Sequence, residues 1–316
     1  MENKPEDFIV DELIELDRRS GEYLYVRLVK KNLNTLDVLN AISKSLNIPR
    51  SHIGFAGNKD KNALTSQYIS LYKVKLSDLK KFKMQNVNLT PLHYGSKPIF
   101  LGSSLGNYFK IKIDFKIKRG LRIDYLTNYF GQQRFSSNNK DVGKALLLND
   151  FSKACKLINN DKINYYLKNN KDDFVGALKK LDRTLLSLYI NAFQAYLWNE
   201  VAKSVIKYNY KHYHIFDNLL FVERPRSSLI IPLISYDTNF KNNVIKKHYF
   251  ELLRKENINI TNYYIKEFPQ IVFKTGSRHL FVRVKNFKIH KDFVEFVLPK
   301  GAFATVFIKN IKAINK

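Results

Sequence analysis

Residues 51–74 read SHIGFAGNKDKNALTSQYISLYKV, a loop rich in glycine and lysine that runs into alternating apolar and polar residues. The alternation predicts a β-strand over 68–76, because successive side chains of a strand point to opposite faces. The loop before it has too few apolar residues to lie in a core. Asp60 stands in this loop between Lys59 and Lys61. The stretch therefore places a carboxylate with two flanking cations next to a strand.

The chain before and just after this stretch favours further strands and one helix. Residues 7–13 and 23–29 are predicted strands around a turn, and residues 107–115 alternate as another strand. Thr35 is expected to cap a helix that Ile48-Pro49 ends. The apolar residues of this helix recur at helical spacing and are Leu36, Leu39, Ile42 and Leu46.

The pattern changes in the second half of the chain. Residues 121–135 are predicted to form a helix that ends near Gly131, and a long helix is expected from about Arg183 to Lys207. The strand pattern returns at 279–287 and 292–308. The order of strand-rich, helix-rich and strand-rich segments indicates a helical domain inserted into an α+β domain.

Charge and aromatic content point to a nucleic-acid partner. The chain has 54 Lys and Arg against 28 Asp and Glu, a net charge of +26, with 19 Tyr and 23 Phe. A polyanion relieves such a charge by releasing counterions, and aromatic faces beside cations suit unpaired bases, which favours RNA over duplex DNA. With 45% hydrophobic residues the chain can bury a core, which excludes a disordered basic tail.

Several other classes of protein are excluded by what the sequence lacks. A single cysteine, Cys155, rules out a disulfide framework, and no apolar run reaches the length of a membrane span. There is no phosphate-binding or dinucleotide-binding glycine motif. His212 and His214 form the one close histidine pair, with no carboxylate cluster beside them, so we expect no metal site. The protein is expected to be soluble and cytoplasmic, with no membrane contact and no nucleotide cofactor.

Asp60 allows two interpretations from its spacing alone. Flanking cations favour the ionised form of a carboxylate, which a nucleophile requires. An aspartate in a solvated turn also starts or caps a bend without any chemistry. Both interpretations stay open at this point.

Seven segments, in this order along the chain, match the pattern of one known family. They are PEDFIVDE (5–12), GEYLYVRLVKKNLNT (21–35), GFAGNKDKNALTSQ (54–67), LGSSLGNYFKI (101–111), NYFGQQRF (128–135), NAFQAYLWNE (191–200) and FVLPKGAFAT (296–305). With these segments the chain resembles the TruD family of pseudouridine synthases over essentially its whole length. The resemblance implies an α+β pseudouridine synthase catalytic domain with a mixed, mainly antiparallel sheet. It assigns this domain to residues 1–153 and 278–316, and an α-rich inserted TRUD domain to residues 154–277.

The resemblance also implies an activity. The family isomerises uridine in RNA to pseudouridine without cofactor or metal, and its best-known target is uridine 13 in the D-arm of tRNA. Asp60 is the implied nucleophile, and the expected partner of this monomer is tRNA, with other RNAs also open. The alternative is a non-catalytic RNA-binding protein that retains the fold.

Eight further residues are expected at the substrate. Asn128 is implied to hydrogen-bond Asp60 or the uracil edge, and the rings of Phe8, Phe130 and Phe303 to line the pocket. Core packing is the other interpretation of each Phe.

The remaining four residues are cations. Lys59, Lys61 and Arg134 are expected to contact phosphate or to be charges in the pocket. The family commonly has a basic residue three positions before Pro-Glu-Asp-Phe. This chain has Glu2 there, so Lys4 is the nearest cation.

Overall fold

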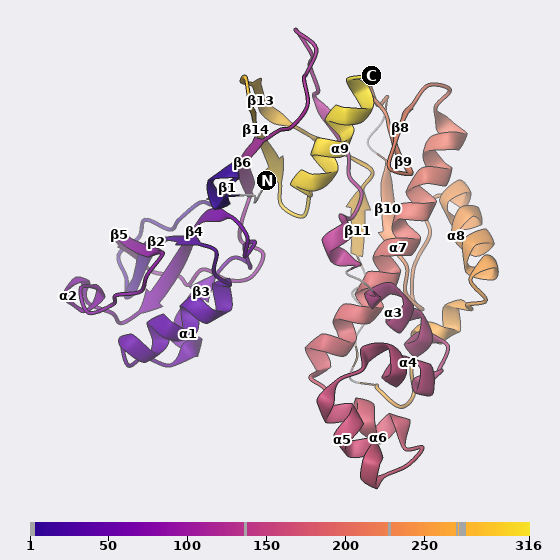
Figure 1. Cartoon of the computed structure of the whole chain (residues 1–316), viewed down its shortest axis with the longest axis horizontal. Coiled ribbons are helices and arrows are strands. Elements are labelled where there is room, and N and C mark those ends of the chain that lie inside the picture. Colours follow the sequence, from indigo (N-terminus) through magenta and orange to yellow (C-terminus); the bar gives the residue numbers. More distant parts are fainter. Residues whose placement is uncertain (1–3, 136–137, 227–228, 270, 272–275) are drawn as a thin grey trace. The chain divides into compact units, whose positions relative to one another are not determined.

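The chain folds into two compact units (Figure 1). The structure is a computed structural model, and it describes residues 4–135, 138–226, 229–269, 271 and 276–316. The sheet unit comprises Met1–Asp124, Arg283–Ala304 and Asn315. The helical unit comprises Tyr125–Val282, Thr305–Ile314 and Lys316. The predicted domain division at 153/154 and 277/278 concerns the family's domains and stays a prediction.

The sheet unit contains one eight-stranded mixed sheet. Its strands are β1 (Phe8–Leu13), β2 (Tyr23–Lys31), β3 (Ile53–Phe55), β4 (Leu64–Tyr72), β5 (Val87–Gly95), β6 (Gly106–Lys112), β13 (Lys285–Ile289) and β14 (Phe293–Pro299). Its helical segments are η1 (Pro5–Asp7), α1 (Thr35–Ser45), η2 (Arg50–His52) and α2 (Leu76–Leu79). The strand order is β13-β14-β6-β1-β4-β2-β5, and β3 pairs with β4. Only β1 and β4 run parallel among the described strand pairs of this sheet, which confirms the expected α+β class.

The strand after the Asp60 segment lies in the middle of the sheet. β4 pairs with β1 and β3 on one edge and with β2 on the other. It begins at Leu64, four residues before the predicted start, and ends at Tyr72. The prediction was late because residues 65–67 are all buried, so no alternation marks them as strand. The predicted strands at 7–13 and 23–29 both form, but β4 lies between them.

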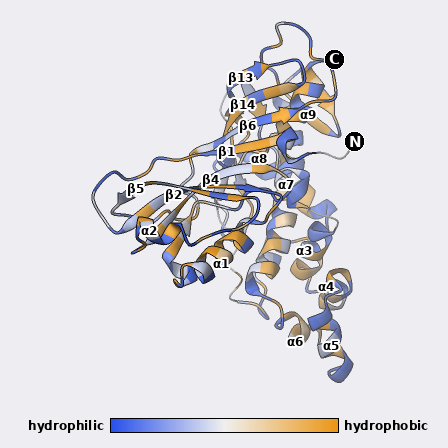
Figure 2. Cartoon of the chain, turned by 60° about the vertical axis from the view of Figure 1, so that its left-hand side comes forward, coloured by the Kyte–Doolittle hydropathy of each residue, from blue (hydrophilic) through white to orange (hydrophobic). Residues whose placement is uncertain are grey.

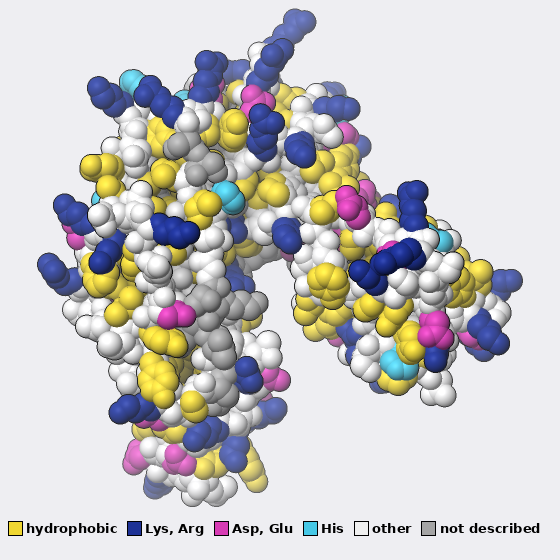
Figure 3. Space-filling view, turned by 180° about the vertical axis from the view of Figure 1, so that it is seen from behind, with side chains coloured by type: hydrophobic (Ala, Val, Ile, Leu, Met, Phe, Trp, Pro, Cys, Tyr) yellow, Lys and Arg dark blue, Asp and Glu magenta, His cyan; other side chains and the backbone are white. Residues whose placement is uncertain are grey.

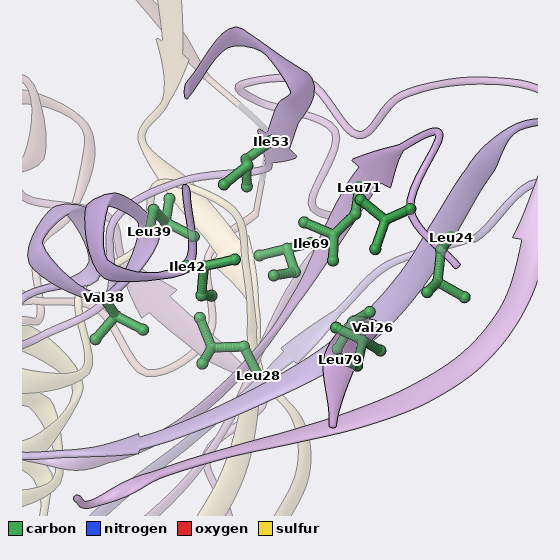
Figure 4. Close-up of a cluster of buried hydrophobic side chains, with 11 residues drawn as sticks. Leu24, Val26, Leu28, Val38, Leu39, Ile42, Ile53, Ile69, Leu71 and Leu79 are labelled. Carbon is green, nitrogen blue, oxygen red and sulfur yellow. The ribbon is translucent and has the colours of Figure 1, made fainter. Parts of the chain in front are cut away.

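A compact apolar core joins α1 to the sheet. Inward side chains of β2 and β4, such as Leu28 and Ile69, meet Leu39 and Ile42 of α1 (Figure 4). The ribbon of α1 changes between hydrophobic and hydrophilic along its length, as an amphipathic helix requires (Figure 2).

Two details of the α1 prediction were wrong. Leu36 is 46% exposed, because it falls off the buried stripe. Asn34 holds the N-cap position, and Thr35 is the first helical residue, with its hydroxyl turned to other partners.

The helical unit surrounds one long helix. Its helical segments are η3 (Gln132–Arg134), α3 (Asn139–Leu147), α4 (Phe151–Ile158), α5 (Asp161–Asn169), α6 (Phe174–Leu178), α7 (Arg183–Asn209), α8 (Asn243–Lys255), η4 (Ile260–Tyr263) and α9 (Ala304–Ile314), whose first residue belongs to the sheet unit. Its short strands are β7 (Tyr125–Thr127), β8 (His214–Phe216), β9 (Leu219–Phe221), β10 (Ile230–Leu233), β11 (Gly276–His279) and β12 (Phe281–Arg283), whose last residue belongs to the sheet unit. They form the pairs β8-β9, β10-β11 and β7-β12.

The predicted helix from Arg183 to Lys207 is confirmed as α7. Asp182 caps it by accepting a hydrogen bond from the Thr184 N–H. Helix α3 packs closely on it, because a Cβ at Gly143 would stand 2.2 Å from the Tyr189 carbonyl oxygen. Among the helices that the structure describes, none is both long and apolar enough to cross a membrane.

Two other predictions of secondary structure were wrong. Residues 121–135 form β7 and η3 rather than a helix, because β7 pairs with β12 and the Asn128 N–H donates to the Leu280 carbonyl. Local sequence contains no sign of these partners about 150 residues away. The strand pattern at 292–308 ends at Pro299, and α9 follows after a turn at Gly301, whose φ of +80° suits glycine. The strand expected at 107–115 forms as β6 but ends at Lys112.

Candidate active site

The loop that carries Asp60 connects β3 to the central strand β4. We call residues 56–63 the Asp60 loop. Asp60 is half-buried, Lys61 is exposed, and Ala63 at the end of the loop is fully buried. The loop therefore leaves the core, presents Asp60 at its surface and re-enters the core at the start of β4.

Two polar side chains beneath the loop fix its backbone. The Thr35 hydroxyl accepts from the Lys59 N–H at 3.0 Å and donates to the Gln67 side-chain oxygen at 3.1 Å. The Gln67 amide nitrogen in turn donates to the Gly57 carbonyl at 3.3 Å. Because Thr35 and Gln67 are buried, these bonds are shielded from water and hold residues 57–59 in one conformation.

A buried ion pair holds the side chain of Lys59. Its Nζ lies 2.6 Å from Oε1 of Glu12, and the two side chains are 9% and 0% exposed. The second carboxylate oxygen of Glu12 accepts from the Tyr68 N–H at 3.0 Å. Of the two roles expected for Lys59, this geometry favours a charge within the site over a phosphate contact.

Lys30 is a candidate that reasoning from the sequence missed. It lies on β2 with its side chain fully buried, and its Nζ donates to the carbonyl oxygens of Leu33 at 2.8 Å and Asp60 at 2.8 Å. The signal was present, because Leu24, Val26 and Leu28 alternate as core residues and the next residue on that face is a lysine. A charge at a core position of an alternating strand calls for a partner.

Phe8 lies near the Asp60 loop within the sheet unit. The parallel pairing of Ile9 with Leu64 places the start of β1 beside the end of the loop. Phe8 is half-buried, and its ring meets Phe109 edge-on with centroids 6.3 Å apart. This geometry accommodates both expected roles of Phe8, core packing and pocket lining.

Phe303 and Lys4 are also placed in the sheet unit. Phe303 is half-buried in the segment after β14. That segment approaches the start of the Asp60 loop, because Lys300 Nζ donates to the Gly102 carbonyl at 3.0 Å and the Gly102 N–H donates to Ala56 at 2.8 Å. Lys4 is exposed before η1, and its role beside Asp60 stays a prediction. Glu2 lies outside the described residues.

In the helical unit, the half-buried Arg278 holds Asn128. Arg278 donates through Nε to the Asn128 carbonyl at 2.7 Å and through Nη2 to Oδ1 of Asn128 at 2.6 Å. The Asn128 amide nitrogen donates to the His279 carbonyl at 3.1 Å. These contacts determine which way the amide points, and they leave one N–H and one lone pair of Asn128 for other partners. Asp60 belongs to the other unit, so the bond expected between Asn128 and Asp60 stays a prediction.

Phe130 is packed between cationic and aromatic groups. The Arg278 guanidinium carbon lies 4.2 Å from the centroid of the Phe130 ring, and the Trp198 ring meets the same ring at right angles with centroids 5.6 Å apart. Asn199 holds the backbone of Phe130 through two hydrogen bonds, of 2.9 and 3.0 Å. The ring of Phe130 is therefore rigidly placed although it is half-buried.

Arg134 adds a second cation to this cluster. Its Nε is buried and has no hydrogen-bond partner among the described residues. Burial lowers the pKa of Arg134, and burial together with the Arg134 charge lowers the pKa of Arg278 to about 10. Two neighbouring cations that repel each other are a suitable environment for an anion, and the expected role of Arg134, at phosphate or as a charge in the pocket, stays a prediction.

The surface of the protein is basic, and its histidine and acidic side chains are dispersed. Lys and Arg side chains are spread over the visible surface of both units and outnumber the acidic ones (Figure 3). Within the described part of the chain, no group of His, Cys, Asp and Glu side chains is placed to hold a metal ion. His214 instead faces Glu223 at 3.9 Å.

Comparison with known proteins identifies the family. The family model for tRNA pseudouridine synthase D (TruD) matches residues 1–165, 161–218 and 217–311. A Nanoarchaeum equitans protein named "Probable tRNA pseudouridine synthase D" is 31% identical over 92% of this chain and 87% of its own length. The tRNA pseudouridine synthase D of Aquifex aeolicus is 25% identical over 98% of this chain and 97% of its own.

A solved structure shares the fold. The crystal structure of a Methanosarcina mazei protein titled "Putative tRNA pseudouridine synthase D (TruD)" superposes with a TM-score of 0.71 at 22% identity, over 98% of this chain and 92% of that chain. From the family match and these relatives, we conclude that the chain belongs to the tRNA pseudouridine synthase D (TruD) family, a family of isomerases.

Proposed function

We propose that this protein is a tRNA pseudouridine synthase that converts uridine 13 of the D-arm to pseudouridine, with Asp60 as nucleophile. The construction of the Asp60 loop is the observation that carries the proposal. Lys30, Thr35, Gln67 and Glu12 reach it from different segments and hold its backbone or the side chain beside Asp60. A merely solvated turn does not need so many buried polar contacts, whereas a nucleophile needs a defined position.

The isomerisation breaks one bond and forms another. The bond between N1 of uracil and C1′ of ribose breaks, the detached uracil turns, and C5 bonds to C1′ while the C5 proton is lost and N1 gains one. An ionised Asp60 would attack either C1′ or C6 of the base. The reaction is an isomerisation, so its balance needs no oxidant, reductant or ATP.

The target base must leave its stack in the RNA before this chemistry takes place. Extrusion costs a few kcal/mol, which stacking on an aromatic ring offsets in part. Phe130 fits this task because its neighbours hold the ring rigidly. We assign Phe8 and Phe303 to the pocket, Asn128 to the uracil edge or to Asp60, and Lys61 and Arg134 to phosphate. We expect the protein to act as a monomer in the cytoplasm.

Site-resolved mapping of pseudouridine tests the proposal. Unmodified tRNA transcripts with uridine or cytidine at position 13 are incubated with wild type and with Asp60→Asn, and no cofactor is added. The wild type should convert the uridine transcript at that position. Asp60→Asn should lose at least about 10⁴-fold in rate, because removal of a nucleophile typically costs that much or more, and should keep its affinity for the tRNA.

The outcomes separate the two candidate functions. Conversion at another position of the tRNA would replace uridine 13 as the target and keep the enzyme class. Tight, salt-sensitive binding without conversion of any uridine in total cellular RNA would favour the non-catalytic RNA-binding protein.

A further inference from the structure

Lys30, whose Nζ contacts the backbone of the Asp60 loop, is one of the most deeply buried charges of the sheet unit. Its side chain is fully buried on the core face of β2. An ammonium has three N–H donors, and three carbonyl oxygens lie within reach of this one. They belong to Leu33 at 2.8 Å, Asp60 at 2.8 Å and Lys59 at 3.4 Å. Lys30 therefore ties the turn before α1 to the peptide of Asp60 itself.

Burying this cation has a cost that a neutral donor would avoid. Burial lowers the pKa of Lys30 to about 8, the charge of Asp60 opposes the shift, and the charge of Lys59 adds to it. The carboxylate of Glu12 is paired with Lys59. Asp60 is the acidic group whose charge acts on Lys30. An amide side chain would satisfy carbonyl oxygens without that desolvation cost. We therefore attribute the positive charge of Lys30 to a requirement of the Asp60 loop.

We propose that Lys30 is a positioning residue for Asp60, whose ammonium holds the carbonyls of Lys59 and Asp60 and supplies positive charge to the loop that carries the carboxylate. This inference rests on the proposed role of Asp60 as nucleophile. It assigns a cation to the site from β2, at a position different from the one before Pro-Glu-Asp-Phe where the family commonly has it and where this chain has Glu2.

Two substitutions on adjacent residues of β2 separate this role from general electrostatics. Lys30→Met removes the buried ammonium and keeps the shape of the side chain. Lys31→Met removes the same charge from the opposite face, where the Lys31 side chain is 39% exposed and pairs with Glu6 at 2.6 Å. The attraction of the whole protein for RNA changes equally in both variants, so a difference between them belongs to the contacts of Lys30.

The first measurement is the rate of a single turnover on tRNA bound to saturation. We expect Lys30→Met to lose about 100-fold in rate, since a misplacement of about 1 Å costs that much, with its tRNA affinity unchanged. Lys31→Met should equal wild type. A rate for Lys30→Met within threefold of wild type would overturn the proposal, as would a loss confined to tRNA affinity.

The pH dependence of the same rate adds a readout that a purely structural tie would not change. The charged groups acting on Lys30 are Asp60 and Lys59. The wild-type rate should fall as pH rises above about 8, where Lys30 loses its proton. Lys30→Arg, which stays charged, should lack this fall. A wild-type rate that stays level to pH 9.5 would contradict the need for the charge.

Hydrogen exchange keeps the test independent of activity. In Lys30→Met, the amides of residues 56–63 should exchange at least about tenfold faster than in wild type or Lys31→Met, because the loop has lost its anchor. Unchanged exchange would overturn the positioning role whether or not the protein modifies tRNA. If the wild type makes no pseudouridine while the exchange result holds, the proposed function fails and the anchoring role stands.

Discussion

The Asp60 loop of the sheet unit and the Asn128–Phe130 segment of the helical unit are held in the same way by different cations. In each, a cation from another part of the chain donates to backbone carbonyls; it is the fully buried Lys30 in one and the half-buried Arg278 in the other. Lys30 does this in the sheet unit with a point charge, and Arg278 does it in the helical unit with a planar fork that also binds the Asn128 side chain. A lysine positions a peptide, whereas an arginine also orients a side chain and covers an aromatic ring.

The two cations also differ in how readily they lose their proton. The pKa of Lys30 is lowered to about 8, and that of Arg278 to about 10. The Asp60 loop should therefore respond to mildly alkaline pH, while the Asn128–Phe130 segment should not.

Removal of Arg278 should have the largest effect. Arg278→Met leaves two carbonyl oxygens and the Asn128 amide oxygen without their donor, so we expect the rate in the bound state to fall about 100-fold. Stability should fall by about 2–4 kcal/mol, since each hydrogen bond to a charged group contributes about 1.5–3 kcal/mol and water replaces part of the three lost donors at this half-buried position. Single-turnover kinetics and urea unfolding measure the two effects.

Arg224→Met is the matched control, because Arg224 is an exposed arginine of the same unit. It should unfold like wild type. Arg278→Lys, which keeps a charge and loses the fork, should restore part of the stability and little of the rate. A lysine variant with the full wild-type rate would show that charge alone suffices, and the contrast with Lys30 would disappear.

The pH dependence of the free energy of unfolding should distinguish Lys30 from Arg278. Its pKa in the folded chain, about 8, is below the ordinary 10.5, so between these values the unfolded chain binds a proton that the folded chain does not. Stability therefore rises with pH in this window, and the cost of the buried charge is fully present below pH 8. From pH 8 to 9.5 the wild type should gain about 2 kcal/mol relative to Lys30→Met.

Chemical unfolding of both proteins across this range measures that gain. Other groups titrate equally in the two chains, so the difference between the curves isolates Lys30. Arg278→Met compared with wild type should show no such change up to pH 9.5. Parallel curves for wild type and Lys30→Met would mean that Lys30 keeps its ordinary pKa.

A smaller effect should come from the hydroxyl of Thr35. Thr35→Val removes the link between the Lys59 N–H and Gln67, at a cost of about 1 kcal/mol in stability and about tenfold in rate. Thr65→Val is a matched control on β4, because the Thr65 hydroxyl is buried and has no hydrogen-bond partner among the described residues. It should be neutral or slightly stabilising. Equal losses in the two variants would show that the hydroxyl of Thr35 has no special part in the loop.

Local pattern was sufficient for some elements and insufficient for others. The strands β1 and β2 and the helices α1 and α7 were predicted correctly, because their apolar residues recur at the spacing of a strand or of a helix. The segment around Asn128 was predicted as a helix and forms a short strand and a 3₁₀ turn, because partners near residue 280 decide its conformation. Period alone cannot report a partner so distant in sequence.

The family, the α+β class, the basic composition and Asp60 as the candidate nucleophile can all be predicted without the fold, because they depend on motifs and residue counts. The residues that hold the Asp60 loop and the Asn128–Phe130 segment depend on the fold. Lys30, Glu12 and Arg278 acquire their roles from partners 30, 47 and 150 positions away. A buried charge is tolerated only where folding brings hydrogen-bond partners to it, and those partners come from segments far apart in the sequence.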